Sequence, residues 1–509
     1  MDTQSRKPSF TLSLLTFIGI AAIIGFGLIG LKLDAHVPIA CAACFAALVG
    51  KYVVGIGWGE MEETVFATIT SSMSALLILF TIGMLIGSWM LSGVVPGMIY
   101  YGLNLLTPGS FLLATLLLCS IVSVATGSSW GVGGTVGVAL IGIAAGLGIP
   151  APLTAGVIIS GAYFGDKMSP LSDTTNLAPA VSGSNLYDHI RAMMWTTTPS
   201  YLIVMAIVVY LGNRYGGGSA AFDPSRIEAM QSLMLQEFTI NPYYTAIPPL
   251  VVLILALIKY PAIPGMIAGT AAASILSLIQ GRSLHDVLNA IHYGYTSTVA
   301  TQVSKVSLEG VPELLGKLNI TNVVPEAAHE AGKLLTSLLN RGGISSMMWS
   351  LSLIIIALVL GGIMERCAFL ETILSPLLKK VKTVGGFVAL VMGSCFAGNF
   401  FLGDQYLGIV VPGRMFKGAV DKTDLSPRML SRTLEDCATM TAVLIPWTGC
   451  GAFQASALGV PTLTYLPYCF LNYINPIVAL IMTYMGIGIY WGKDKADKVE
   501  RRTALSFEA

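Results

Sequence analysis

Long apolar runs with almost no charge recur along this chain, and they limit the folds that it can adopt. The first run covers residues 10–31, about 22 residues, which suits a membrane-spanning helix of roughly 20 residues and exceeds the core of a signal peptide. Of the 509 residues, 54% are apolar and only 11% are charged, whereas soluble domains carry about 25% charged residues. So few charges cannot keep such a surface in water, and the sequence therefore predicts an all-α polytopic membrane protein.

Further apolar runs predict the remaining spans. We expect them near residues 36–57, 70–92, 110–126, 193–212, 245–258, 262–279, 348–364, 385–402 and 464–491. Basic residues flank the two outermost spans, namely Arg6 and Lys7 before the first, and Lys493, Lys495, Lys498, Arg501 and Arg502 after the last. Because Lys and Arg concentrate in cytoplasmic flanks, both termini are predicted to be cytoplasmic and the number of crossings even, about 10 to 12. The expected location is the cell inner membrane.

Charge balance and motifs exclude several functions. The 28 basic and 27 acidic residues give a net charge of +1, so a nucleic-acid partner is not expected. The chain contains no nucleotide-binding loop of the form G-x-x-x-x-G-K-[ST], so this chain alone cannot be an ATP-driven pump. We expect a transporter driven by an ion gradient, neither an enzyme nor a carrier of a bound cofactor. The eight cysteines lie mostly within apolar runs, and no disulfides are expected.

Two polar stretches, near 213–244 and 281–346, interrupt the apolar runs. The second places charged residues among Leu and Val, which is typical of short amphipathic helices that lie on a membrane face or link two halves. We therefore divide the chain into a first half (1–280) with a hairpin region at 152–180, an amphipathic linker (281–346), a second half (347–492) with a broken helix at 434–459, and a cytoplasmic tail (493–509).

The apolar run that starts at residue 152 stops part-way across a membrane. It has about 14 residues, or roughly 21 Å at 1.5 Å per residue, against a hydrocarbon core of about 30 Å. It leads into the segment GDKMSPLSDTTNLAP at 165–179, which carries two prolines and a run of side-chain oxygens. Irregular backbone is tolerated at membrane depth only where protein or a water-filled cavity satisfies it, so this segment is a candidate ion or substrate site. The alternative is a solvated loop between two helices.

A comparable segment lies in the second half, where LEDCATMT at 434–441 is followed by an apolar run that Pro446, Gly449 and Gly451 interrupt. A glycine-rich polar patch precedes each segment, TGSSWGVGG at 126–134 and GNFFLGDQYLG at 398–408. The spacings are similar, since residues 127 and 166 are 39 apart and residues 403 and 436 are 33 apart. We therefore expect two structural repeats, each contributing a discontinuous helix to a midplane site.

Segment 165–179 is similar to the signature of the NhaC-type sodium/proton antiporters. TGSSW at 126–130, GDQY at 403–406, LED at 434–436 and IPW at 445–447 also match, and the matches extend over most of the chain. The family belongs to the wider ion-transporter superfamily. The resemblance implies two inverted repeats, re-entrant hairpins, a scaffold that dimerises and a transport domain that moves as an elevator. It implies exchange of sodium for protons across the cytoplasmic membrane, with these ions, the lipid bilayer and a second copy as partners.

In that superfamily a hairpin tip of the Ser-Asn-Thr type binds sodium and substrate carboxylate, and the corresponding stretch here is SDTTN at 172–176. Its added carboxylate favours a cation over an organic anion. Sodium prefers several oxygen ligands, as other hard cations do. We expect Asp173, Thr174 and Asn176 to bind it, with Ser172 and Thr175 beside them. Because burial favours a neutral carboxyl and a nearby cation favours the ionised form, Asp173 can hold either a proton or sodium.

Further candidate ion- or substrate-binding residues come from both halves, namely Ser128, Ser129, Asp166, Asp404, Glu435, Asp436, Thr439 and Thr441. Asp166 is either a second ligand or the partner of Lys167, whose long side chain could alternatively extend to the membrane interface. The acidic pair at 435 and 436 could orient the site from the other repeat or simply pair with Arg428 or Arg432. Sodium is expected only as a transported substrate.

Other functions stay open at this point. Sodium- or proton-coupled exchange or symport of a small organic acid or amino acid, of the malate/lactate type, shares the motif. An arginine near the midplane would favour it, because a carboxylate suits a bidentate partner, and Arg414 and Arg432 are the candidates near the repeats. A channel is disfavoured, since breaks in two separate helices suit alternating access better than a continuous pore. His189 could adjust the pH response, although a single interfacial histidine is more often simply hydrated.

Overall fold

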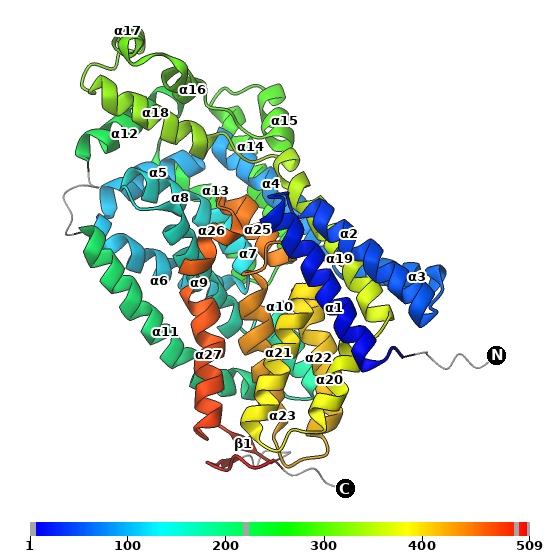
Figure 1. Ribbon diagram of the computed structural model, residues 1–509. Helices are drawn as coiled ribbons and strands as arrows, with labels where there is room; N and C mark the ends of the chain where they lie inside the picture. Colours follow the sequence, from blue (N-terminus) through cyan, green and yellow to red (C-terminus); the bar gives the residue numbers. More distant parts are fainter. Residues whose placement is uncertain (1–6, 217–222, 493–497, 506–509) are drawn as a thin grey trace.

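The structure is a computed structural model that describes residues 7–216, 223–492 and 498–505 (Figure 1). Most of it is helical, with a two-stranded antiparallel ribbon, β1 (Tyr490–Trp491) and β2 (Lys498–Val499), near the C-terminus. Within the described ranges, 9 helices are long and apolar enough to cross a membrane, or up to 11 if each of two bent helix pairs is one span. The prediction of an all-α polytopic membrane protein is confirmed. Of the flanking basic residues, Arg6, Lys493 and Lys495 lie outside the described residues.

The N-terminal helices form one side of the molecule, on the right in Figure 1. This group consists of α1 (Phe10–Gly25), the π-helical turn η1 (Phe26–Gly30), α2 (His36–Val49), the π-helical turn η2 (Gly50–Val54) and α3 (Trp58–Ser71). Helices α2 and α3 pack against α19 (Ile344–Arg366), and α1 packs against α2 and α20 (Phe369–Leu378). Distant parts of the sequence therefore form one helical layer.

A second group consists of α4 (Met73–Leu91), α5 (Val94–Leu105), α13 (Pro242–Leu257) and α14 (Ala262–Ile279), in which α14 packs against both α4 and α13. Helix α12 (Pro224–Glu237) precedes α13 with an 84° bend between them. The bend has a local cause. Pro242 begins a new helix and the Asn241 side chain caps it by accepting from the Tyr243 amide, so the chain cannot continue in a straight line.

The first broken segment lies among six helices and one π-helical turn, namely α6 (Pro108–Thr126), α7 (Ser129–Val132), η3 (Gly133–Gly137), α8 (Val138–Gly146), α9 (Ala151–Met168), α10 (Asp173–Ser182) and α11 (Leu186–Gly216). The sequence expectation of a polar glycine-rich patch at 126–134 missed a span, because residues 129–146 are a continuous apolar helix long enough to cross a membrane. Its glycines serve close packing: a Cβ at Gly134 would lie 2.8 Å from the Ile82 side chain. Glycine there marks contact between helices, not a loop.

The second broken segment lies among α21 (Val384–Leu402), α22 (Gln405–Val420), α23 (Pro427–Leu434), the π-helical turn η5 (Glu435–Thr439), α24 (Met440–Ala442), α25 (Gly449–Leu458), α26 (Thr462–Tyr465), the 3-10 turn η6 (Leu466–Tyr468) and α27 (Phe470–Tyr484). The acidic pair at 435 and 436 thus lies inside a helical run, and the break comes after it, at 443–448. The run 462–484 is itself bent by 54°.

Residues 281–346 form short helices, namely α15 (Leu284–Tyr293), α16 (Thr298–Lys305), the 3-10 turn η4 (Leu308–Gly310), α17 (Val311–Lys317) and α18 (Pro325–Leu339). In α18 the alanines at 327, 328 and 331 are buried, while Glu326, Glu330 and Lys333 are exposed. With α12, these helices cover the upper end of the molecule in Figure 1, whereas the start of α1 and β1 lie in its lower half.

Candidate functional site

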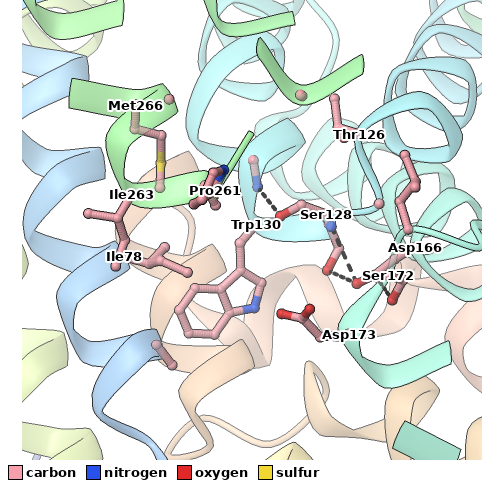
Figure 2. Close-up of a pocket in the computed structure, with 18 of the residues that line it drawn as sticks. Ile78, Thr126, Ser128, Trp130, Asp166, Ser172, Asp173, Pro261, Ile263 and Met266 are labelled. Carbon is pink, nitrogen blue, oxygen red and sulfur yellow. Dashed lines mark hydrogen bonds between the residues drawn. The ribbon is translucent and has the colours of Figure 1, made fainter. Parts of the chain in front are cut away.

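The two broken segments border one cavity of about 730 Å³. From the first half, residues 127–131 and residues 170–174 at the break line it. From the second half, residues 404–406 and 449–450 line it. Ser72 and the turn between α13 and α14 also line it. Figure 2 places the labelled side chains of Ser128, Ser172, Asp166 and Asp173 on one wall and the apolar Ile78, Ile263 and Met266 on another. The cavity is therefore polar on the side of the breaks and apolar opposite them.

The two halves build their parts of this cavity in the same way. Helices α6 and α21 both have 19 residues and both end at a left-handed glycine, Gly127 (φ 68°) and Gly403 (φ 69°). The next residue caps the following helix: the Ser128 side chain accepts from the Gly131 amide, and the Asp404 side chain accepts from the Tyr406 and Leu407 amides. A left-handed residue next to a close neighbour requires glycine, since a Cβ at Gly127 would lie 2.7 Å from the Leu171 backbone.

The correspondence continues at the breaks. Ser172 caps α10 and Thr448 caps α25; both helices have 10 residues and end at a left-handed glycine, Gly183 and Gly459. Each of these positions follows its counterpart by 276 residues (127 to 403, 172 to 448, 183 to 459). This register corrects the expectation that 165–179 corresponds to 434–451, because Asp166 now corresponds to Ala442. Caps and helix ends define the register, and the acidic residues do not follow it.

Asp166 is the centre of the polar wall. Its Oδ2 accepts from the Ser129 hydroxyl (2.5 Å) and amide (3.3 Å), and its Oδ1 accepts from the Ser172 hydroxyl (2.5 Å). The carboxylate is buried in the protein, 8% exposed, yet it lines the cavity. Two helix starts, those of α7 and α10, therefore point hydroxyl groups at one carboxylate.

A chain of hydroxyl groups joins Asp166 to the second half. The Ser172 hydroxyl lies 3.1 Å from that of Thr174, which donates to Glu435 Oε1 at 3.0 Å. Glu435 is fully buried, and its second oxygen makes no close hydrogen bond among the described residues; the Thr439 hydroxyl is its polar neighbour. The two broken segments therefore contact each other at Thr174 and Glu435.

Lys167 does not extend to the membrane interface, nor does it pair with Asp166. Its ammonium group is fully buried and donates to Asp436 Oδ1 at 2.5 Å. The same oxygen accepts from the Thr196 hydroxyl and the Asn475 amide, both at 3.0 Å. Burial of two charges is tolerated only when both are paired and hydrogen-bonded, and here the pair joins α9 directly to η5.

The expected sodium ligands separate in the structure. Asp173 is exposed to the cavity, where Figure 2 shows its carboxylate pointing inward, and Thr174 also lines it. Asn176 is not among the lining residues, since its amide nitrogen donates to the carbonyls of Pro170 and Ser172 and so stabilises the turn. The Thr175 hydroxyl likewise donates to the carbonyls of Asp166 and Lys167 at 3.0 Å and caps α9.

The candidates of the second half mostly have structural contacts. Asp404 lines the cavity, but it caps α22 and accepts from the Ser72 hydroxyl at 3.2 Å. The Thr441 hydroxyl donates to the Cys437 carbonyl and accepts from the Asn399 amide. The Thr439 hydroxyl is buried beside the Glu435 carboxylate and makes no close hydrogen bond among the described residues. Of these three, only Asp404 reaches the cavity.

The basic residues and the histidine named from the sequence lie elsewhere. Arg414 is exposed and does not line the cavity, and Arg428 pairs with Asp188 at 3.3 Å. Arg432 is buried, with its Nε 3.7 Å from Asp436 Oδ2, so one of the expected pairings is present. His189 is fully buried and its Nδ1 lies 2.6 Å from the Ser431 hydroxyl, so the expectation of a hydrated interfacial histidine is wrong.

Sequence reasoning missed several residues at the site. They are the cavity-lining Ser72, Lys259, Pro261, Gln405, Tyr406 and Cys450, and the Asp436 partners Thr196 and Asn475. Lys259 has a left-handed backbone (φ 61°) and lies at the turn between α13 and α14. One signal was available: Asn472 and Asn475 are amides in an apolar helix, and both are fully buried. A polar side chain inside a span indicates a partner there.

Comparisons with known proteins agree along nearly the whole chain. A family model described as the Na+/H+ antiporter family matches residues 161–487. The chain is 36% identical to the Na(+)/H(+) antiporter NhaC of Alkalihalophilus pseudofirmus, over 97% of this chain and 99% of that protein. It is 36% identical to the arginine/ornithine antiporter ArcD of Halobacterium salinarum, over 97% and 96%, and 34% identical to the malate-2H(+)/Na(+)-lactate antiporter of Bacillus subtilis, over 97% and 99%.

Proposed function

Because this chain belongs to the Na+/H+ antiporter family, we propose that it is a secondary active transporter that exchanges sodium for protons across the cytoplasmic membrane. The proposal includes a location in the cell inner membrane with both termini cytoplasmic. One observation carries it: the Asp166 and Asp173 carboxylates line a cavity of about 730 Å³ at the point where two helices break. Carboxylates at such breaks in a membrane helix are a default ion site.

Within this proposal, Asp173 binds the ion that enters the cavity. Its carboxylate faces the cavity beside the hydroxyl of Thr174 and the more buried Asp166. Sodium takes several oxygen ligands, as hard cations do, and these side chains supply one exposed carboxylate, one buried carboxylate and neutral hydroxyl groups. A proton and a sodium ion on the same carboxylate oppose each other electrostatically. One carboxylate that holds either ion, and not both, is sufficient for exchange.

Glu435 gives the second half a part in the same site. Its Oε1 accepts from Thr174, and its buried Oε2 makes no close hydrogen bond among the described residues, with the Thr439 hydroxyl and the Lys167 ammonium group as neighbours of the carboxylate. A buried carboxylate oxygen without a hydrogen bond is costly unless a proton or a cation satisfies it. We infer that Glu435 holds one of the exchanged ions during part of the cycle, while Asp404 and Asn176 act by shaping the helix ends.

Two inverted repeats and an elevator movement complete the proposal. The shared offset of 276 residues between the helix caps supports the repeats. Opposite orientation of the two repeats is supported by the surroundings of the first residues of α6 and α21. Helix α6 starts beside the end of α11, where a Cβ at Gly109 would lie 3.6 Å from Gly216, whereas the Val384 amide at the start of α21 donates to Thr503 in the tail. A homodimeric scaffold around a moving transport domain is the arrangement that the family resemblance implies.

One observation favours a second candidate function, which is coupled transport of a small organic acid or amino acid. The cavity is far larger than a sodium ion, and Lys259 is among the residues that line it. A lysine ammonium group can bind a substrate carboxylate as a point charge. The names of the two other antiporter relatives, for arginine/ornithine and for malate and lactate, fit this candidate.

Flux through proteoliposomes separates the two functions. Purified protein is reconstituted with a pH-sensitive dye inside the vesicles, and sodium is added outside. We expect a sodium-dependent change of internal pH without any organic solute. A pH change that requires malate, lactate, arginine or ornithine would favour the second candidate, and no sodium dependence in any mixture would contradict sodium/proton exchange.

A further inference from the structure

The described residues after the last helix pack against the second half of the protein. Residues 485–492 and 498–505, here called the C-terminal strap, cross the ends of several helices of the second half. The Ser426 amide donates to the Tyr490 carbonyl, the Gly492 amide to Asp424, and the Leu505 amide to Lys382. The strap also buries four apolar side chains, Ile489, Tyr490, Trp491 and Leu505, against the cluster formed by α21, α22 and α23.

Arg432 connects this strap to the interior. It is 1% exposed, and its NH1 donates to the Gly488 carbonyl at 2.8 Å while its NH2 donates to the Thr483 hydroxyl at 3.3 Å. Its Nε faces Asp436 Oδ2 at 3.7 Å, and neither of these two atoms has a hydrogen bond within the described ranges. The guanidinium group is therefore hydrogen-bonded to the strap and forms an ion pair with Asp436 that is too long for a hydrogen bond.

Asp436 stands between two cations. Its Oδ1 holds Lys167 at 2.5 Å, and its Oδ2 faces Arg432 without a bond. Glu435 precedes Asp436 in the chain, and an ammonium group that Asp436 holds less tightly has the Glu435 carboxylate of the ion site as its next partner. Lys167 already lies close enough to Glu435 to attract it electrostatically.

We propose that Arg432 is a positioning residue of the ion site, which couples the seating of the C-terminal strap to the hold of Asp436 on Lys167. When the strap is seated, Arg432 donates to the Gly488 carbonyl, and the full charge of Asp436 holds the Lys167 ammonium group. When the strap is displaced, Arg432 loses that carbonyl and closes the 3.7 Å gap to Asp436. A bond from Arg432 to Oδ2 takes up part of the negative charge of Asp436, so its hold on Lys167 at Oδ1 weakens and the ammonium group competes with sodium at Glu435. This inference rests on the proposed sodium/proton exchange.

A single added methyl group tests the coupling. Gly488 has a left-handed backbone (φ 69°), and a Cβ there would lie 3.1 Å from the Trp195 ring. Gly488→Ala should raise the apparent KM for sodium by roughly five- to thirtyfold, the factor that 1–2 kcal/mol of left-handed strain converts to. The maximal rate at saturating sodium should stay unchanged, because saturating sodium displaces the competing Lys167 ammonium group. Gly281→Ala is the matched control, since Gly281 is equally left-handed (φ 85°) with nothing within 4 Å of its Cβ and lies outside the strap.

The role of Arg432 is tested by combining substitutions. In an Arg432→Met background, Gly488→Ala should leave the sodium KM almost unchanged, because the side chain that transmits the displacement is gone. A purely structural role of the strap would make the two effects additive. If Gly488→Ala does not fold, Tyr490→Phe replaces it. That variant removes only the hydroxyl that accepts from Trp195 Nε1 at 2.9 Å, and should shift the KM by about two- to tenfold.

The outcomes separate this inference from the proposed function. A folded wild-type protein without sodium-driven proton flux would contradict the proposed function. If the wild-type protein shows this flux and the strap variants keep the wild-type KM for sodium, the proposed function stands. The coupling between the strap and the ion site is then contradicted. A KM shift of equal size in the presence and absence of Arg432 would overturn the assignment of that residue.

Discussion

The buried pair of Lys167 and Asp436 gives the structure its sharpest energetic prediction. Both side chains are fully buried, and their atoms lie 2.5 Å apart. Lys167→Met keeps most of the volume of the side chain and removes the charge, so Asp436 is left as a buried anion. Removal of one partner from a buried pair costs about 3–5 kcal/mol. We expect a cost of about 3 kcal/mol, the lower end of this range. The Asp436 carboxylate still faces Thr196, Asn475 and, at 3.7 Å, Arg432.

The loss should be visible in thermal unfolding. With an unfolding entropy of roughly 2.1 cal/mol/K per residue over 509 residues, about 3 kcal/mol lowers the Tm by about 3 °C. The assay is tryptophan fluorescence of the purified protein in detergent during a temperature ramp. Wild type, Lys167→Met, Asp436→Asn and the double variant are compared at one protein concentration and one scan rate.

The double variant decides whether the two residues act on each other. Asp436→Asn alone leaves the Lys167 ammonium group buried without its carboxylate, and should lower the Tm by a similar amount. In the double variant no unpaired charge from this pair remains, so its Tm should lie close to that of either single variant. Interaction energies of contacting residues reach about 0.5–3 kcal/mol. Tm losses that add fully in the double variant would refute the pairing as the reason for the effect.

Three further predictions concern the site. Asp173→Asn should abolish sodium-driven proton flux while the elution profile of the protein stays unchanged, because Asn keeps the shape and loses the titratable charge; retained flux with wild-type sodium dependence would remove Asp173 from the mechanism. Thr174→Val should raise the sodium KM by roughly tenfold or more, since a hydrogen bond to a charged group contributes about 1.5–3 kcal/mol, and Thr174→Ser, which keeps the hydroxyl near Glu435, should stay close to wild type in the same flux assay. Gly127→Ala should lower the yield of folded protein in size-exclusion chromatography, because its Cβ would lie 2.7 Å from the Leu171 backbone; a normal yield would show that the turn can relax.

Much of the fold follows from patterns of apolar length and of Gly and Pro. The break at 165–179 was predicted because the apolar run is too short and two prolines end it, and the structure places the break between α9 and α10 there. The same reasoning missed the helix at 129–146, because its glycines resemble those of a loop. A glycine chosen for contact between helices and a glycine chosen for a turn look alike in a sequence; only the packed neighbour, such as Ile82 against Gly134, distinguishes them.

The sequence predicted which residues line the candidate site better than it predicted which residues contact each other there. Asp166, Asp173 and Thr174 do line one cavity, and Ser172 donates to Asp166. The partner of Lys167 could not be predicted, because Asp436 is 269 residues away and competing acidic residues are much nearer in sequence. The helix caps of the two halves share an offset of 276 residues, at which the two acidic segments do not line up. Helix caps such as Ser172 and Thr448 carry the correspondence, and a hydroxyl cap is too common in sequences to be recognised alone.

Sodium binding across pH tests most directly the central claim, that protons and sodium share the carboxylates of one site. Titration calorimetry of the purified protein between pH 6 and pH 9, in buffers with different ionisation enthalpies, gives the sodium affinity and the number of protons released for each sodium bound. We predict that the affinity weakens as the pH falls and that protons are released on binding, because reciprocal linkage requires sodium to lower proton affinity by the same factor. In Asp173→Asn, both effects should disappear together. A wild-type affinity that stays flat over this range, with no proton release, would contradict a shared site.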